Sequence, residues 1–342
     1  MHTTSLHAAL LLATAYGSTA FSFSFPKSSS SSLSRRQDTS SSSSSDSSGS
    51  SSGDYGCPAI WTTISSELTD NFLSDGQCND LARGAIRFGF HDAAATSNNI
   101  AFTAPASGGA DGSLLLNPDE INRRDNNGLR DYYNWLSGFY PKYQDQVSAA
   151  DLIQFAAAHA TVTCPGGPVI KVRVGREDSD AAPQEGLLPP GFGPNASHDA
   201  LLALFTAKGF SAADLAALIG AHSASRAFAQ SQIPTGGAQD STPGQLDVKY
   251  YSETYNPPAD VYRFDSDINL SQKNTSVGAV FQTFVGAQGK WAAAFADAAA
   301  RLSVLGIPAE TVAGFVDCTS ALPSGTSAKR DIRARPINDR VR

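Results

Sequence analysis

Residues 87–92 read Arg-Phe-Gly-Phe-His-Asp, and residues 218–223 read Leu-Ile-Gly-Ala-His-Ser. In the first stretch Arg87 and His91 are four residues apart, so a helix places both on one face. An imidazole can move a proton, and a fixed positive charge can stabilise a departing anion. The second stretch places His222 on an otherwise apolar helix, where a lone histidine is more often a core residue. Each stretch therefore places one histidine on a predicted helix.

Each of these histidines is followed by an oxygen-bearing residue and then by a loop of alternating oxygen donors. Asp92 follows the first histidine, and residues 108–113 read Gly-Gly-Ala-Asp-Gly-Ser. Ser223 follows the second, and residues 240–247 read Asp-Ser-Thr-Pro-Gly-Gln-Leu-Asp. Hard oxygens at alternate loop positions suit calcium. Either loop alone is better explained as an ordinary turn, but their duplication around both histidines favours two calcium sites.

The rest of the chain has mainly helical periodicity. Apolar residues at helical spacing predict helices over 60–72, 78–95, 148–160, 197–208, 211–222 and 276–303. Ser148 and Ser211 each stand three residues before an aspartate, which is typical of a capping box. Convincing strands are scarce, and the best is Val169–Val174. The sequence therefore predicts an all-α class with long loops over 96–128, 176–196 and 227–262.

Both ends of the chain are expected to lie outside the folded domain. Residues 1–20 resemble a secretory signal peptide, 21–56 are a serine-rich segment with a potential dibasic processing site at Arg35-Arg36, and 323–342 form a basic tail. This leaves 57–322 as the domain. No other stretch is apolar enough to span a membrane, and a net charge of −7 argues against nucleic-acid binding. Three sequons fit a secreted, glycosylated protein: Asn195, Asn269 and Asn274.

The two other histidines of this domain and its cysteines carry less information. His159 lies in an alanine-rich helix end and is expected to be structural, and His198 is expected to be exposed. A secreted chain can keep disulfides, and its four cysteines allow three pairings. Spacing alone does not choose among them.

Four motifs together carry a family resemblance: residues 87–92, residues 108–113, Gly220–Ser223 and Asp240–Gly244. In this order and spacing they resemble the heme peroxidases of the plant, fungal and bacterial superfamily, and most of all the secreted fungal class (class II). The resemblance covers essentially the whole folded domain. It implies a plant-peroxidase-like helical domain with heme b between a distal and a proximal half, and two calcium ions.

The resemblance also implies roles around the heme. His222 is expected to bind the iron, and Asp267 to accept its other N–H, which gives the imidazole more anionic character. His91 is expected to act as the distal base toward hydrogen peroxide, beside the charge of Arg87, with Asn126 fixing its tautomer. The remaining implied positions are Glu120 behind Asn126, Phe90 over the heme, and Arg226, Leu188 and Pro189 near the propionates.

Calcium ligands and disulfides follow from the same resemblance. The distal calcium is expected to bind Asp92, the Gly109 carbonyl, Asp111 and Ser113. The proximal calcium is expected to bind Ser223, Asp240, Thr242, the Gln245 carbonyl and Asp247. The implied disulfides are Cys57–Cys318 and Cys78–Cys164.

Departures from the family pattern narrow the expected donor. Manganese-oxidising members carry three acids where this chain has Asp80, Gly84 and Phe228, and lignin-oxidising members carry a surface tryptophan where it has Ala217. Gln239 also replaces an aromatic residue beside the heme. The sequence thus predicts a secreted, monomeric peroxidase that uses hydrogen peroxide to oxidise small phenolic donors one electron at a time. The alternatives are a ligninolytic or manganese-type peroxidase, or a non-catalytic calcium-binding protein on the same fold.

Overall fold

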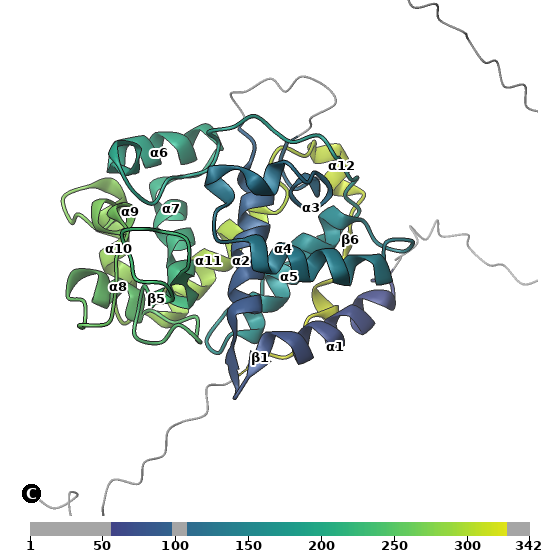
Figure 1. Ribbon diagram of the computed structural model, residues 1–342, viewed down its shortest axis with the longest axis horizontal. Helices are drawn as coiled ribbons and strands as arrows, with labels where there is room; N and C mark the ends of the chain where they lie inside the picture. Colours follow the sequence, from purple (N-terminus) through teal and green to yellow (C-terminus); the bar gives the residue numbers. More distant parts are fainter. Residues whose placement is uncertain (1–55, 98–107, 327–342) are drawn as a thin grey trace, which may run out of the picture. The chain divides into compact units, whose positions relative to one another are not determined.

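The computed structural model describes residues 56–97 and 108–326, which form a mainly helical domain (Figure 1). The α-helices are α1 (Ile60–Phe72), α2 (Asp80–Ala94), α3 (Ser113–Leu116), α4 (Arg130–Phe139), α5 (Ala149–Thr163), α6 (His198–Ala207), α7 (Ala212–Leu218), α8 (Lys249–Tyr255), α9 (Asp265–Leu270), α10 (Ser276–Phe284), α11 (Gln288–Leu302) and α12 (Ala309–Ala313). The all-α prediction is confirmed. The predicted signal segment, the dibasic pair and most of the serine-rich segment and basic tail lie outside the described residues.

One half of the domain is built around α2, which carries Arg87 and His91. This helix begins at Asp80 because the Asn79 side chain accepts hydrogen bonds from two backbone N–H groups of the first turn, at 3.0 and 3.2 Å. It packs along α5 (Figure 1). A Cβ at Gly89 would lie 2.4 Å from the Ala157 Cβ, so glycine permits this close approach.

The other half is built around α7 and the 3₁₀ turn η5 (Ile219–Ala224), which carries His222 and packs with α8. The α-helical ladder stops there because Tyr251 and Trp291 donate to carbonyls of the preceding turn, at 2.8 and 3.1 Å. A Cβ at Gly220 would lie 2.3 Å from Trp291 Nε1, so only glycine fits. The prediction of a regular α-helix through His222 is therefore wrong in its last turn.

Other boundaries also differ from the prediction. The single helix expected over 276–303 is divided into α10 and α11, because Gly286 adopts φ 68° between them. The expected loop 227–262 contains α8, and α4 lies beyond any predicted element. The expected strand shrinks to β3 (Arg173–Val174).

The strands are two residues long and lie in the connections between helical elements. They pair antiparallel as β1 (Leu73–Ser74) with β2 (Gln77–Cys78), β3 with β6 (Val316–Asp317), and β4 (Arg226–Ala227) with β5 (Gly237–Ala238). The remaining 3₁₀ turns are η1 (Glu120–Asn122), η2 (Arg124–Asn126), η3 (Tyr140–Lys142), η4 (Pro194–Ala196) and η6 (Thr319–Ala321). Disulfides join Cys57 to Cys318 and Cys78 to Cys164, the pairing that the resemblance implied.

The structure bears on the predictions about membrane spans and glycosylation sites. Among the described residues no single helix is long and apolar enough to cross a membrane, although α6 and the bent continuation through α7 and η5 satisfy that test together. The sequon residues Asn195 and Asn274 are exposed, whereas the Asn269 amide nitrogen donates to the Ala196 carbonyl at 2.9 Å. That nitrogen is the one to which a glycan attaches, so Asn269 is the least suited of the three.

Candidate active site

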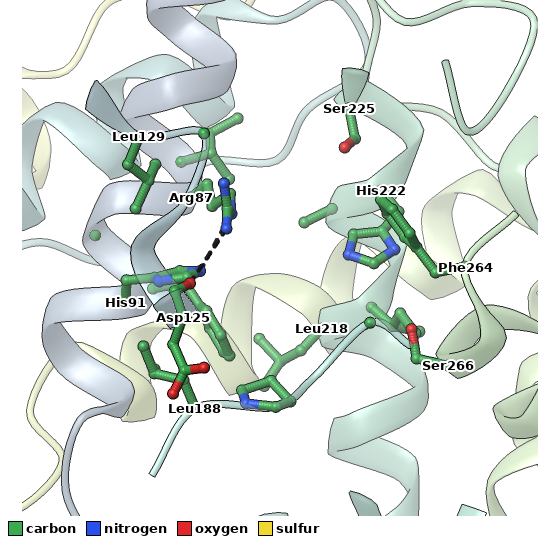
Figure 2. Close-up of a pocket in the computed structure, with 18 of the residues that line it drawn as sticks. Arg87, His91, Asp125, Leu129, Leu188, Leu218, His222, Ser225, Phe264 and Ser266 are labelled. Carbon is green, nitrogen blue, oxygen red and sulfur yellow. Dashed lines mark hydrogen bonds between the residues drawn. The ribbon is translucent and has the colours of Figure 1, made fainter. Parts of the chain in front are cut away.

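A cavity of about 1040 Å³ separates the two histidine-bearing elements. Figure 2 shows Arg87 and His91 on one wall and His222 with Phe264 on the opposite wall. This volume lies at the upper end of the range for small-molecule and cofactor sites. The structure thus brings together two histidines that are 131 positions apart in the sequence.

A chain of hydrogen bonds fixes the tautomer of His91. Its Nδ1–H donates to Asn126 Oδ1 at 2.8 Å, and the Asn126 amide donates onward to the Glu120 main-chain carbonyl at 2.8 Å. Arg87 Nε donates to His91 Nε2 at 3.2 Å (Figure 2). Nε2 is therefore the unprotonated nitrogen. The sequence predicted Glu120 as a carboxylate behind Asn126, but it is the carbonyl of Glu120 that Asn126 contacts.

Burial controls the protonation of this pair. Burial first, and then the positive charge of Arg87, lower the pKa of His91 to about 3, although the hydrogen bond with Asn126 acts in the opposite direction. Burial also lowers the pKa of Arg87, to about 10. At neutral pH the wall therefore presents a neutral base beside a cation.

Backbone carbonyls that the sequence analysis did not identify orient Arg87. Its guanidinium donates to the Asn127 carbonyl at 2.8 Å and to the Asp125 carbonyl at 3.4 Å. Gly128 follows at φ 87°, and a Cβ there would lie 3.1 Å from Arg87 Nη1. The Asn-Gly pair at 127–128 was the available signal, since it is typical of a tight turn.

The opposite wall holds His222 by a carboxylate. His222 Nδ1–H donates to Asp267 Oδ1 at 2.8 Å, and the Phe264 backbone N–H donates to Asp267 Oδ2 at 2.8 Å. Asp267 is fully buried, at 0% exposure. This bond leaves the lone pair of His222 Nε2 available to a metal, as in carboxylate–histidine–metal arrangements. The imidazole points into the cavity (Figure 2).

The residues around the cavity fit a heme. The lining is largely apolar between the two imidazoles and includes Leu188, Leu218 and Phe264. The predicted contacts Phe90, Pro189 and Arg226 also line it, and Arg226 is exposed. A flat apolar macrocycle with an axial nitrogen ligand matches this combination of an imidazole and apolar walls.

Oxygen atoms at the predicted distal calcium site also fit a cation. Asp92 is 1% exposed, and its Oδ1 has no hydrogen-bond partner within the described residues. Burial first, and then the neighbouring Asp111 and Glu120, raise the pKa of Asp92 well above its usual value. A positive ion beside these carboxylates would remove that penalty.

The predicted proximal calcium ligands also converge. Ser223 Oγ donates to Asp240 Oδ2 at 2.7 Å and lies 3.3 Å from the Gln245 carbonyl oxygen. Thr242 Oγ1 donates to Asp247 Oδ2 at 2.9 Å. Over the described residues no group of three or more His, Cys, Asp or Glu side chains is suited to hold a metal. Each predicted calcium site would therefore depend on hydroxyl and carbonyl oxygens as well as two carboxylates.

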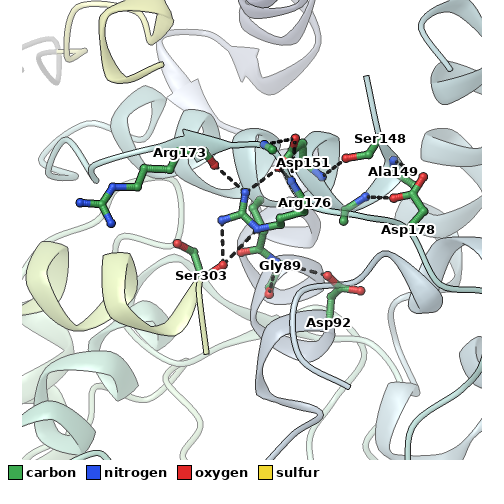
Figure 3. A network of polar contacts seen from close by, with 12 residues as sticks. Gly89, Asp92, Ser148, Ala149, Asp151, Arg173, Arg176, Asp178 and Ser303 are labelled. Atoms are coloured by element: carbon green, nitrogen blue, oxygen red, sulfur yellow. Dashed lines mark hydrogen bonds and ion pairs between the residues drawn. The ribbon is translucent and has the colours of Figure 1, made fainter. Parts of the chain in front are cut away.

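A buried ion pair beside α5 was missed from the sequence (Figure 3). Asp151, predicted to complete a capping box with Ser148, instead accepts from Arg176 Nη1 at 2.7 Å. Arg176 also donates to the Ser303 carbonyl at 2.7 Å, which ties α5 to the end of α11. Ser148 Oγ still accepts from the Asp151 N–H at 3.1 Å, and Asp178 accepts from the first two N–H groups of α5, at 2.9 Å. Arg176 lies in a predicted loop, so its burial had no sequence signal.

Comparisons with known proteins agree with this geometry. The family model described as "Peroxidase" matches residues 64–287. Manganese peroxidase H4 of Phanerodontia chrysosporium is 32% identical over 277 residues, which cover 73% of this chain and 70% of that protein. Versatile peroxidase VPS1 of Pleurotus eryngii is 27% identical over 292 residues (80% and 76%), and a peroxidase of Arthromyces ramosus is 28% identical over 287 residues (78% and 76%).

The chain belongs to the peroxidase family. It is an oxidoreductase that acts on hydrogen peroxide, and the family implies heme as its cofactor. The resemblance to the fungal class, drawn from the four motifs, is thereby confirmed.

Proposed function

We propose that this protein is a secreted, calcium-braced peroxidase that oxidises small phenolic donors in single-electron steps. One observation carries the proposal: Arg87 and a neutral His91 face His222 across a single cavity. The two disulfides suit an oxidising compartment, and the net charge of −7 argues against a nucleic-acid partner. We expect the protein to act as a monomer.

The two walls of the cavity have different roles. A heme bound here would supply the redox chemistry of its iron. His91 Nε2 would accept a proton from hydrogen peroxide and return it to the departing oxygen, while Arg87 would stabilise the developing negative charge. Asn126 keeps the accepting nitrogen of His91 unprotonated and directed at the cavity. Asp267 holds the imidazole of His222, whose Nε2 would bind the heme iron.

Manganese oxidation does not suit this chain, although several relatives are named manganese peroxidases. Mn²⁺ prefers several oxygen ligands. Asp80, the one acid at the three corresponding positions, is paired with Arg83 at 2.6 Å, and Phe228 is 48% exposed. A Cβ at Gly84 would lie 2.7 Å from the Tyr132 Cβ, so a longer side chain is sterically excluded there.

A tryptophan route for large lignin-like donors does not suit it either. Ala217 stands at the family's tryptophan position, and it is fully buried. Its carbonyl accepts from the equally buried Trp291. Nothing at this position reaches the surface, which favours donors small enough to enter the cavity.

A non-catalytic calcium-binding role explains the cavity poorly. Such a protein would need the two oxygen-rich loops, but not a charged Arg87 and a base in one apolar cavity. A buried arginine and histidine are costly to keep without a function that uses them. The catalytic reading is therefore the one we adopt.

Absorption spectroscopy of the heme-loaded protein tests the proposal. The Soret band should fall within milliseconds of mixing with hydrogen peroxide and recover when a phenol is added. A chain that shows no Soret band after expression with heme would contradict the proposal, and a Soret band that ignores peroxide would favour the calcium-binding alternative. Manganese added in place of phenol should give no recovery.

A further inference from the structure

Asp267 accepts a hydrogen bond that the family roles do not account for. Tyr250 Oη donates to Asp267 Oδ1 at 3.0 Å, and this is the same oxygen that accepts from His222 Nδ1 at 2.8 Å. The Tyr250 side chain is fully buried, and its ring lies edge-on to the His222 ring at 5.9 Å. Two donors therefore share one carboxylate oxygen.

The sharing of one oxygen has an electronic consequence. A hydrogen bond to a carboxylate is charge-assisted and draws electron density toward the donor. Density drawn toward the phenol leaves Oδ1 a weaker acceptor for the His222 N–H. The other oxygen of Asp267 already accepts from the Phe264 backbone N–H, so it is not free to accept from His222 or Tyr250 instead.

We infer that Tyr250 is a positioning residue that weakens the anionic character of the His222 imidazole through Asp267. The inference rests on the proposed function, in which His222 would bind the heme iron. A more anionic imidazole favours the ferric over the ferrous state of a bound heme, since ligand hydrogen bonding is one of the means by which a protein sets that balance. The phenol therefore moves the balance toward ferrous iron.

The test compares two tyrosine-to-phenylalanine variants of one helix in the heme-loaded protein. Tyr250→Phe removes the hydroxyl that contacts Asp267 and keeps the ring. Tyr255→Phe is the matched control, because Tyr255 lies on the same helix and donates to the Ser271 carbonyl at 2.9 Å, away from His222. Spectroelectrochemical titration gives the ferric/ferrous midpoint potential of each protein.

Tyr250→Phe should shift the ferric/ferrous equilibrium toward ferric iron by about tenfold, which is about 59 mV for one electron. The iron–imidazole stretching frequency in resonance Raman spectra of the ferrous protein should rise, and both values should stay unchanged in Tyr255→Phe. An unchanged or higher potential in Tyr250→Phe would overturn the inference.

Structural outcomes are also decisive. Loss of folding or of heme in Tyr250→Phe alone would overturn the inference, because the hydroxyl would then serve the structure. Failure of the wild-type protein to bind heme would instead refute the proposed function, so the two failures are distinguishable.

Discussion

The two histidines of the cavity differ in the acceptor that holds them. His91 donates to the neutral amide oxygen of Asn126, and His222 donates to the carboxylate of Asp267, both at 2.8 Å. The same ring and the same bond length therefore give different chemistry. With the neutral acceptor Asn126, the His91 imidazole remains an ordinary base, while the anionic acceptor Asp267 makes the His222 imidazole a stronger metal ligand.

The backbone around the two histidines differs as well. His91 lies in the last turn of a regular α-helix that begins at a well-formed cap. His222 lies in a tighter 3₁₀ turn, where Tyr251 and Trp291 bind the preceding carbonyls. The proximal histidine is thus positioned by tertiary contacts, and the distal histidine mainly by its own helix.

Removing the distal base should have the largest effect. His91→Leu should retain heme and slow the peroxide-dependent decay of the Soret band by about 10⁴-fold, because Arg87 alone cannot move the proton. Stopped-flow absorption measures this rate. His198→Leu, which changes a histidine outside the cavity, should react at the wild-type rate. Equal rates in both variants would show that His91 is not the base.

Making the proximal acceptor neutral should have the next largest effect. Asp267→Asn replaces the carboxylate that accepts from His222 by a neutral amide, the kind of acceptor that His91 has on the distal wall. The peroxide reaction should therefore slow by about 100-fold. The ferric/ferrous midpoint potential should rise, opposite to the change expected for Tyr250→Phe. Asp265→Asn is the control, because Asp265 lies on the same helix and accepts from the Gly193 N–H instead. A lower potential in Asp267→Asn would contradict the assigned role.

Calcium removal should weaken both walls. At free calcium about ten times the Kd, binding adds about 1.4 kcal/mol of stability per site, or about 3–5 °C in Tm. A chelator should lower the Tm in calorimetry, and calcium should restore it while magnesium should not. Asp92→Asn and Asp240→Asn should each remove part of the response. A Tm indifferent to the chelator would argue against both sites.

Most of the candidate residues that line the cavity could be named from the sequence because they fall in short local motifs. Arg87, His91 and their acidic neighbour lie within six positions, and helical spacing alone places them together. Features made by tertiary contact had no such signal. The ion pair between Asp151 and Arg176 and the shared bond of Tyr250 join segments that the sequence pattern treats as unrelated.

The secondary structure shows the same contrast between local signals, which the sequence reveals, and tertiary contacts, which it does not. Helices with clear caps, such as those after Asn79 and Ser197, were predicted close to their bounds. The single helix predicted over 276–303 is broken at Gly286, which adopts a left-handed conformation. The break was not predicted because apolar residues continue at helical spacing on both sides of it. The end of α7 also differed, since its last carbonyls are bound by side chains distant in sequence.

A second buried histidine separates burial from function, and its effect should be the smallest. His159 is fully buried outside the cavity, bonded to the Ser65 carbonyl at 2.8 Å, and burial lowers its pKa to about 4. The native state then binds fewer protons than the unfolded state between pH 6.5 and 4. This histidine's contribution is therefore complete above pH 6.5 and is lost as the pH falls through that range.

Lowering the pH from 6.5 to 5.5 should therefore cost about 1 kcal/mol of unfolding free energy through this residue. In His159→Gln that part of the pH dependence should disappear from denaturant titrations at the two pH values, whereas the less buried His198→Gln should keep it. The peroxide reaction rate should be the same in His159→Gln as in the wild type. An unchanged pH slope in that variant would mean that the acid sensitivity comes from other groups, and a slower reaction would mean that burial at this position serves the cavity after all.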